Sequence, residues 1–410
     1  MRVVNAYFLQ PLIREPAAAV PGPCQPVWPE SIRKVEKSAQ KTFYRISIRG
    51  KILLPSGGGS CTTTGHHSRI VPPAGFREHP GPDGPEETLR KEHAMHRFKK
   101  ILLVYDPSPS GVTSLAKAVD LVERNEAELT VVAVIDEIPR DYRMLLTAMT
   151  PEEIMSLARK DTLSRLEEYI APFSETGRVT TRVLVGQESI AIIREVLRNG
   201  HDLVMKTARG MGGKLGMLFG STAMHLLRKC PCPVWILKPE ENRRFYRRIM
   251  AALDILPAEA EESGLNKKIM ELTISMAEIE GSEIHIVHVA ENPDDHLLLG
   301  ALDIPPEEIG RWSRETRNMR IGKLDEFLEE FDLADLQHQE HVLQGWADEE
   351  IPQFANEYKI DLLVMGTLAR TGIPGLFIGN TAEKILHRVN CSVLAVKPDG
   401  FISPVTLDED

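Results

Sequence analysis

The chain has 410 residues, of which 42% are apolar, so it is long enough to build more than one hydrophobic core. Its formal net charge of −10 argues against direct binding to nucleic acid, and no apolar stretch approaches the ~20 residues that span a bilayer. Five cysteines and no signal-peptide pattern predict a cytoplasmic protein without a disulfide framework or a membrane anchor.

Residues 1–94 differ from the rest of the chain in charge and composition. They hold 13 Lys and Arg against 8 Asp and Glu, and they contain 12 of the 28 prolines. They show no sustained helical or strand periodicity, so we expect a disordered extension. Lys91-Glu92 can be encoded by a purine-rich ribosome-binding sequence upstream of Met95. We therefore expect the native chain to begin at Met95.

From Lys99 onward, strand and helix patterns alternate. Short apolar runs such as Ile101–Tyr105 are typical of parallel strands buried on both faces. Thr150-Pro-Glu-Glu153 supplies an N-cap, a proline and a glutamate that start a helix. The predicted strands are Ile101–Tyr105, Leu129–Ile135, Val179–Val185, Leu203–Lys206 and Val234–Leu237. The predicted helices are a stripe through Leu115, Val119 and Val122, then Thr150 to about Ile170, Ser189–Asn199 and Thr222–Lys229.

Cys230-Pro231-Cys232 precedes the last of these strands. The spacing is that of half a metal site, but no second Cys or His pair follows at ligand spacing. We expect no metal and interpret these cysteines as small apolar residues that lead into a buried strand.

The second half of the chain repeats the same order of elements. Its predicted strands are Arg248–Asp254, Ile284–Val289, one that ends at Val342–Gly345, one opened by Asp361, and Ser392–Val396. Its predicted helices are a stripe from Leu265 to Ile279 and a long helix within Pro306–Phe331. An interval of 159 residues separates Gly220 from Gly379, Asp202 from Asp361 and Pro239 from Pro398. A constant interval across several elements indicates a duplicated domain.

The alternation predicts an α/β protein with two tandem, doubly wound domains, each with a five-stranded parallel sheet. We place these domains at residues 95–240 and 245–400, followed by an acidic tail at residues 401–410. The last strands, Pro233–Leu237 and Ser392–Val396, are apolar edges. We expect them to pair within the chain, because a bare apolar edge is an aggregation hazard.

Ligands of open parallel sheets bind beyond the carboxyl ends of the strands. Asp106 and Asp254 follow the first strand of each repeat, and glycine-rich loops follow the fourth strand. A glycine loop that leads into a helix suits a phosphate, but glycines after a strand are more often simple turn formers. From the residues alone, both interpretations stay open.

These features together resemble the universal stress protein superfamily. The resemblance rests on the aspartate after strand one, the Gly-x2-Gly-x9-Gly-Ser/Thr loop and the closing Pro-Val-x-x-x-Lys, and it covers residues 97–410. It implies an adenine nucleotide alpha hydrolase-like fold and a site for ATP, with phosphates on the glycine loop, ribose near the aspartate and adenine against strand two. The residues implied by position are Asp106, Val134, Gly210, Gly220 and Ser221 in the first repeat, and Asp254, Val289, Gly366, Gly379 and Asn380 in the second.

Both repeats depart from the family pattern. Thr207 stands at the first glycine of the first repeat, and the second repeat has Ala369 at the second glycine and Asn380 in place of Ser or Thr. The first repeat keeps three of the four motif positions and the second keeps two. If one repeat binds nucleotide, we expect it to be the first.

The resemblance implies a non-catalytic cytoplasmic protein that supports survival under stress, including resistance to DNA-damaging agents. One alternative is slow ATP hydrolysis at one glycine loop. Another is a module that binds a small apolar ligand or a partner protein between the repeats. Four histidines lie outside the loops, and we expect them to be surface or satisfied packing residues rather than catalytic groups. They are His201, His225, His341 and His387.

Overall fold

The structure is a computed structural model that describes residues 68–70, 98–139, 149–208, 219–238, 245–255, 264–290, 305–367 and 378–407. All of these residues belong to the compact unit formed by residues 64–410. The expected disorder of residues 1–94 lies outside the described residues, apart from residues 68–70.

The first repeat contains five strands and their crossover helices. In chain order they are β2 (Lys100–Val104), α3 (Pro109–Asn125), β3 (Glu128–Ile135), α5 (Pro151–Ile170), the 3-10 turn η3 (Ala171–Thr176), β4 (Val179–Val185), α6 (Glu188–Asn199), β5 (Leu203–Thr207), α7 (Ser221–Lys229) and β6 (Val234–Leu237). The capping box that the sequence predicts for α5 is present. The Thr150 amide donates to Glu153 Oε2 over 2.8 Å, and the Glu153 amide donates to Thr150 Oγ1 over 3.2 Å.

The second repeat follows the same order. Its elements are β7 (Arg248–Leu253), α9 (Leu265–Glu280), β8 (Glu283–Ala290), α11 (Pro306–Leu328), β9 (His338–Gln344), α12 (Ala347–Glu357), β10 (Leu362–Gly366), α13 (Asn380–Arg388) and β11 (Ser392–Val396). The predicted strands and helices of both repeats are confirmed to within a few residues at their ends.

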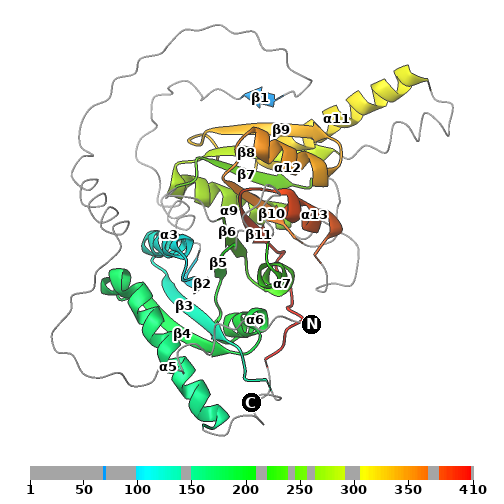
Figure 1. Ribbon diagram of the computed structural model, residues 1–410. Helices are drawn as coiled ribbons and strands as arrows, with labels where there is room; N and C mark the ends of the chain where they lie inside the picture. Colours follow the sequence, from blue (N-terminus) through cyan, green and yellow to red (C-terminus); the bar gives the residue numbers. More distant parts are fainter. Residues whose placement is uncertain are drawn as a thin grey trace, which may run out of the picture. The chain divides into compact units, whose positions relative to one another are not determined.

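All described strands join one 11-stranded sheet, in the order β1-β9-β8-β7-β10-β11-β6-β5-β2-β3-β4 (Figure 1). Within each repeat the five strands are parallel, and the spatial order runs third, second, first, fourth, fifth. The chain reverses its winding between the first and fourth strands, so that pair is the topological switch point of each repeat. The expected doubly wound α/β architecture is confirmed.

The last strands of the two repeats pair with each other, as expected. β6 and β11 run antiparallel, with Leu394 opposite Trp235 and Val393 opposite Ile236. Residues of β6 and β11 are almost completely buried. The pairing therefore removes the two apolar edges and fuses two five-stranded sheets into one.

A short strand from the N-terminal extension adds to the far edge of the second repeat. β1 (Ser68–Ile70) pairs antiparallel with β9, with Arg69 opposite Glu340. The expectation that the whole extension lacks structure is wrong for these three residues. Strand addition at an edge depends on main-chain hydrogen bonds, which a search for side-chain periodicity does not detect.

In each repeat, an aspartate at the start of the fourth strand holds the first and fourth strands in register. The carboxylate of Asp202 accepts hydrogen bonds from the amides of Lys99 and Lys100, at 2.6 and 3.1 Å. Asp361 accepts from the amides of Arg247 and Arg248, at 2.8 and 3.1 Å. The aspartate that opens each fourth strand in the sequence thus sets the register at the switch point.

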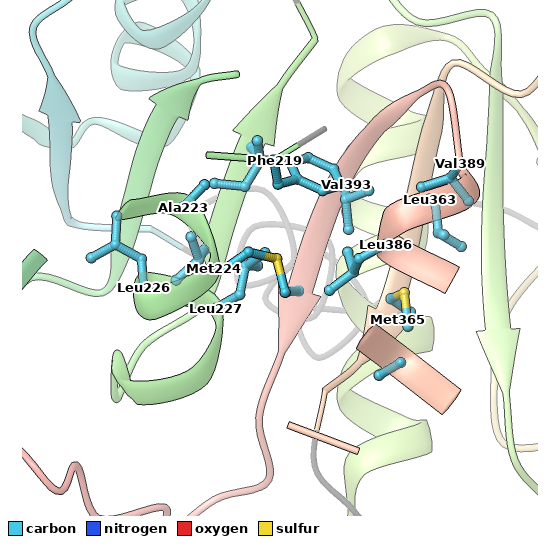
Figure 2. Close-up of a cluster of buried hydrophobic side chains, with 14 of the residues drawn as sticks. Phe219, Ala223, Met224, Leu226, Leu227, Leu363, Met365, Leu386, Val389 and Val393 are labelled. Atoms are coloured by element: carbon cyan, nitrogen blue, oxygen red, sulfur yellow. The ribbon is translucent and has the colours of Figure 1, made fainter. Parts of the chain in front are cut away.

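Two hydrophobic cores lie on opposite faces of the sheet, and each extends through both repeats. One core lies under α6, α7, α12 and α13. Figure 2 shows Met224 and Leu227 of α7 near Leu386 of α13, above the seam where β6 meets β11. The other core packs α3, α5, α9 and α11 against the opposite face. Because each core is shared, the two repeats stabilise each other.

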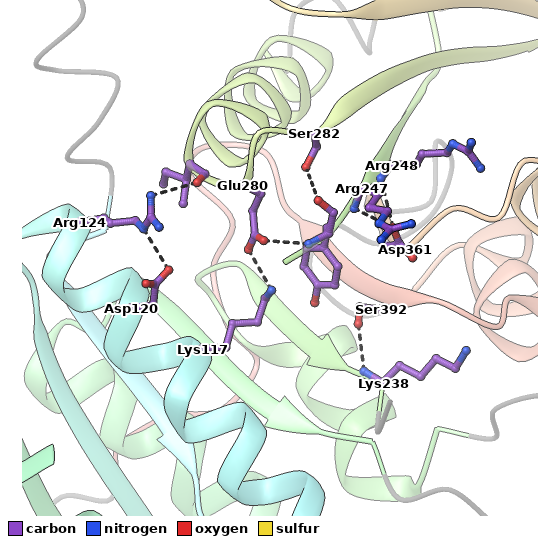
Figure 3. Close-up of polar contacts among 12 residues, drawn as sticks. Lys117, Asp120, Arg124, Lys238, Arg247, Arg248, Glu280, Ser282, Asp361 and Ser392 are labelled. Carbon is purple, nitrogen blue, oxygen red and sulfur yellow. Dashed lines mark hydrogen bonds and ion pairs between the residues drawn. The ribbon is translucent and has the colours of Figure 1, made fainter. Parts of the chain in front are cut away.

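A buried ion pair joins the helices of the two repeats on the second face. Lys117 of α3 lies 2.9 Å from Glu280 of α9, with side chains only 9% and 5% exposed. Glu280 also accepts the amide of Tyr246, and the Lys117 ammonium lies 3.7 Å from the centre of the Tyr246 ring (Figure 3). The charge of Lys117 is therefore matched by a carboxylate and by an aromatic face, which offsets its desolvation.

Candidate functional site

The candidate residues of the first repeat lie at the carboxyl ends of neighbouring strands. Asp106 follows β2, Val134 is the penultimate residue of β3, and Gly220 and Ser221 begin α7. β2 lies between β3 and β5 in the sheet, so these positions surround the switch point. Gly210 belongs to the loop of residues 209–218, which lies outside the described residues.

The Asp106 side chain is held at the start of α3. Its Oδ1 accepts the Ser108 amide at 2.9 Å, and Ser108 caps α3 by accepting the Gly111 amide at 3.3 Å. A Cβ atom on Gly111 would lie only 1.9 Å from the Asp106 carbonyl oxygen. Only glycine fits this joint, which places the first turn of α3 directly against the aspartate.

A tyrosine from α5 holds the contact between Asp106 and the first turn of α3 in place. The Tyr169 hydroxyl of α5 donates to the Gly111 carbonyl oxygen at 2.5 Å, and its ring packs edge-on against Tyr105. Burial raises the pKa of the Tyr169 phenol, which keeps it protonated as a donor. The sequence analysis missed both Gly111 and Tyr169. The single glycine inside the first turn of a helix was the available signal.

The N-terminus of α7 is open toward solvent. Gly220 is its N-cap in an extended conformation, and no side chain caps the first amides. Gly220 and Ser221 are exposed, and a Cβ atom at Gly220 would meet no atom of the described residues within 4 Å. A helix end with uncapped amides and free space above it suits an anionic group.

A polar network that was not predicted from the sequence anchors the first turn of α7. Lys206 Nζ of β5 donates to Glu188 Oε1 at 2.9 Å, and Thr222 Oγ1 of α7 donates to Glu188 Oε2 at 2.7 Å. Lys206 is 8% exposed. Glu188, at the start of α6, thus links the fourth strand to the first turn of α7. The signal was a lysine inside the otherwise apolar fourth strand.

Thr207 occupies the place of the first motif glycine without visible strain. Its Oγ1 lies 2.8 Å from Ser114 Oγ of α3, and both side chains are buried. Thr207 also lies outside the left-handed region of the backbone map. The Thr207 side chain therefore connects β5 to α3. It leaves less free space at the switch point than a glycine would.

The second repeat is more closed at the corresponding positions. Asn266 holds the Asp254 backbone from both sides, accepting its amide at 3.1 Å and donating to its carbonyl at 2.6 Å. Leu265 lies over Gly366, where an added Cβ atom would be 2.7 Å from Leu265 Cδ2. The space that glycine leaves at this point is filled by the first leucine of α9.

The remaining candidates of the second repeat line the same end of its sheet. Val289 lies at the end of β8 and is 9% exposed. Gly379 is buried and donates its amide to the Thr367 carbonyl at 3.1 Å. Asn380 is the exposed first residue of α13, whose end also has no side-chain cap. Residues 368–377, which include Ala369, lie outside the described residues.

Three of the four histidines have the packing or surface environments that the sequence predicts. His225 bonds to Ser189, His341 bonds to His285, and His387 is partly exposed beside Glu383. His201 is the exception, because both of its ring nitrogens are buried without a hydrogen-bond partner, 3.8 Å from Glu195 at the nearest.

Two features are absent from the described residues. No cluster of three or more His, Cys, Asp or Glu side chains is arranged to hold a metal ion in this part of the chain. No helix of the described ranges has both the length and the apolar character to cross a bilayer.

The chain matches the family model described as "Universal stress protein family" twice, over residues 97–238 and 245–397. It is 29% identical to "Universal stress protein E" of Escherichia coli K12 over 327 residues, which cover 77% of this chain and 99% of that protein. A homologue from Haemophilus influenzae is also 29% identical, over 74% of this chain and 98% of its own length.

A solved structure shows the same fold. A universal stress protein structure from Pseudomonas aeruginosa UCBPP-PA14 aligns with a TM-score of 0.55 and 24% identity, over 75% of this chain and 95% of that one. A shorter universal stress protein was solved in complex with cAMP, and 98% of it aligns with 35% of this chain at 16% identity and a TM-score of 0.27.

Proposed function

Because the chain belongs to the universal stress protein family, we propose that it binds one adenine nucleotide per chain, in the first repeat. The phosphates rest on the N-terminus of α7 at Gly220 and Ser221, the ribose lies beside Asp106, and the adenine packs against Val134. Gly210, which lies outside the described residues, is assigned to the phosphates by its motif position alone. Nucleotide binding serves a non-catalytic role in the response to stress, including survival of DNA damage, in the cytoplasm.

The difference between the two helix ends carries this proposal. Gly220 at the start of α7 is exposed, and an added Cβ there meets no atom of the described residues within 4 Å, whereas Gly379 at the start of α13 is buried. Both α7 and α13 begin without a side-chain cap. The first repeat therefore combines uncapped amides with room for a phosphate group. The second repeat has the amides, but its switch point is occupied by an apolar side chain.

The ion pair beside α7 is neutral overall, so it places no net negative charge next to this helix end. Lys206 lies beneath the helix end, and its ion pair with Glu188 keeps that carboxylate neutralised. In the second repeat the residues at the same interval of 159 are Met365 and Ala347, so the pair is absent there. The hydroxyl of Ser221 adds a donor that Asn380 replaces with a bulkier amide. The Ser221 hydroxyl therefore supports the first repeat as the nucleotide site.

Calorimetry with ATP on the full chain tests the proposal. We expect saturable heat for the unchanged chain, and at least a tenfold loss of affinity for Gly220→Val, because the branched side chain fills the space above α7. The matched variant Gly379→Val changes the corresponding residue of the second repeat and should keep the affinity within about twofold. The reverse pattern would place the site in the second repeat, and no heat from the unchanged chain at millimolar ATP would overturn the proposal.

A further inference from the structure

Two cysteines lie side by side where the repeats meet. Cys230 ends α7 by donating its amide to the Leu226 carbonyl, and Cys232 lies two residues before the start of β6. Their sulfur atoms are 3.6 Å apart, within hydrogen-bond distance for thiols. The side chains are buried, with Cys230 fully covered and Cys232 9% exposed. The nucleotide site proposed above does not use either thiol.

A lysine from the second repeat supplies a positive charge at this pair. Lys397 follows β11, is 2% exposed, and donates from Nζ to the Leu227 carbonyl at 2.5 Å. Burial lowers the pKa of Lys397 to about 8, so its ammonium form prevails at neutral pH. Burial alone disfavours the Cys230 thiolate, but hydrogen bonds from Cys232 and the Lys397 charge outweigh it and lower the pKa of Cys230.

A cavity reaches the cysteine pair from solvent. It has a volume of about 500 Å³ and is open to the outside. Its walls include Pro231, Cys232 and Pro233 from the first repeat and Lys268 of α9 from the second. A molecule of a few heavy atoms can therefore approach the Cys232 side of the pair without unfolding the seam.

We propose that Cys230 and Cys232 form a peroxide-reactive dithiol, which closes to a disulfide bond under oxidation and is reopened by small thiols. The neighbouring Cys230 sulfur and burial raise the pKa of Cys232, so the thiolate of the pair lies on Cys230, whereas Cys232 is the sulfur that a hydroperoxide reaches through the cavity. The Cys230 thiolate takes up the proton of Cys232 as the Cys232 sulfur attacks the terminal peroxide oxygen. The S–O bond forms, the O–O bond breaks, and an alcohol or water leaves with that proton.

The second step uses the neighbouring sulfur. Cys230 attacks the sulfenic acid on Cys232, so that the S–S bond forms, the S–O bond breaks, and the oxygen leaves as water with the proton that Cys230 had released to solvent. Overall, two thiols lose two electrons and the hydroperoxide gains them, giving a disulfide, an alcohol and water. The sulfur atoms must approach from 3.6 Å to about 2.05 Å, a small movement at the end of α7.

The chain carries its own control for this reaction. Cys391 stands 159 residues after Cys232, directly before the last strand of its repeat, and it is 3% exposed. The position that corresponds to Cys230 is Val389. Burial is thus similar at Cys232 and Cys391, but only Cys232 has a thiol two residues before it.

Peptide mapping of the reduced full chain after brief treatment with hydrogen peroxide tests the proposal. Cys230 and Cys232 follow Lys229, so one tryptic peptide holds both and no other cysteine. We expect this peptide to lose two hydrogens. Its cysteines should become resistant to alkylation at least ten times faster than Cys391 does. Dithiothreitol should restore the peptide, and in concentrated urea the difference in rate between the two peptides should shrink severalfold.

Two variants test whether the Lys397 charge, rather than general exposure of the cysteines, sets the rate of disulfide closure. Lys397→Met should slow closure severalfold, whereas Lys238→Met, which changes the corresponding lysine of the first repeat, should leave the rate within about twofold. Equal rates at Cys232 and Cys391 in the folded chain would overturn the proposal. So would a Cys230–Cys232 peptide that stays reduced, or a disulfide that joins either residue to Cys24 or Cys61 instead.

Discussion

Two histidines of the second repeat are buried against each other between the sheet and α12. His285 of β8 and His341 of β9 are 1% and 2% exposed, and their Nδ1 and Nε2 atoms lie 3.2 Å apart. The rings of Phe354 and Tyr358 pack against both imidazoles. One imidazole must donate and the other accept, so the contact needs at least one neutral ring.

This pair predicts a loss of stability in mild acid. Burial lowers the pKa of His285, opposed by Glu283 and reinforced by Arg248. The unfolded chain, with an ordinary pKa of about 6.5, therefore binds the proton more readily. The stabilisation is fully present above pH 6.5 and is lost as the pH falls through the lowered value. Urea midpoints measured from pH 8 to pH 5 should fall accordingly.

The matched variants are His285→Gln and His387→Gln. Glutamine at position 285 keeps a polar group but cannot take up a proton, so the acid-dependent part of the curve should flatten, whatever happens to stability at pH 8. His387 is partly exposed on α13, and its variant should keep the full dependence. An unchanged curve for His285→Gln would show that other groups cause the acid sensitivity.

From the sequence, individual motif residues could be placed only where the constant interval between the two repeats pairs them. The interval of 159 residues puts Asp202 with Asp361 and Gly220 with Gly379, and the structure places each pair at corresponding points of the two repeats. The Lys206–Glu188–Thr222 network was not predictable in this way. Its members come from three elements. In the second repeat, no polar residue stands at the positions that correspond to Lys206 and Glu188.

The contact between α3 and the end of β2 positions Asp106, and it depends on one glycine. Replacing Gly111 by alanine would ordinarily stabilise a helix, by about 1 kcal/mol. Here the new Cβ would lie 1.9 Å from the Asp106 carbonyl oxygen, so the helix and the turn must separate. We expect Gly111→Ala to destabilise the chain by about 1–3 kcal/mol in urea unfolding.

Gly322 offers the control for that variant. It is an exposed glycine inside α11, where an added Cβ atom would meet no atom within 4 Å. Gly322→Ala should therefore stabilise the chain, by about 0.5–1 kcal/mol. Opposite signs for the two alanine variants support the close contact at Asp106. Stabilisation by both would mean that α3 does not press against the turn.

Helix ends with local signals were predictable, and those set by distant contacts were not. The Thr150 capping box and Gly200, which ends α6 with a φ of 66°, are both readable in the sequence. α3 ends instead at Glu126 with a φ of 50°, a conformation that glutamate seldom adopts. No local pattern marks that end, because the cap follows from how α3 leads into β3.

The duplicated order of strands and helices was sufficient to predict the architecture of the whole molecule. Alternating periodicities gave the parallel sheets, and two apolar last strands indicated that the repeats would pair. Two related domains that pair through the same strand meet antiparallel, as β6 and β11 do. The strand β1 was missed, because three residues carry no periodicity of their own.

The two repeats share one architecture but differ in whether they bind a nucleotide, and a native mass spectrum at saturating ATP reveals this difference by counting bound ligands. For the full chain we expect a mass increase of one nucleotide, kept in Gly379→Val and absent in Gly220→Val. Two nucleotides per chain would contradict the claim that Leu265 closes the second site. A single nucleotide that persists in Gly220→Val and disappears in Gly379→Val would contradict the assignment to the first repeat.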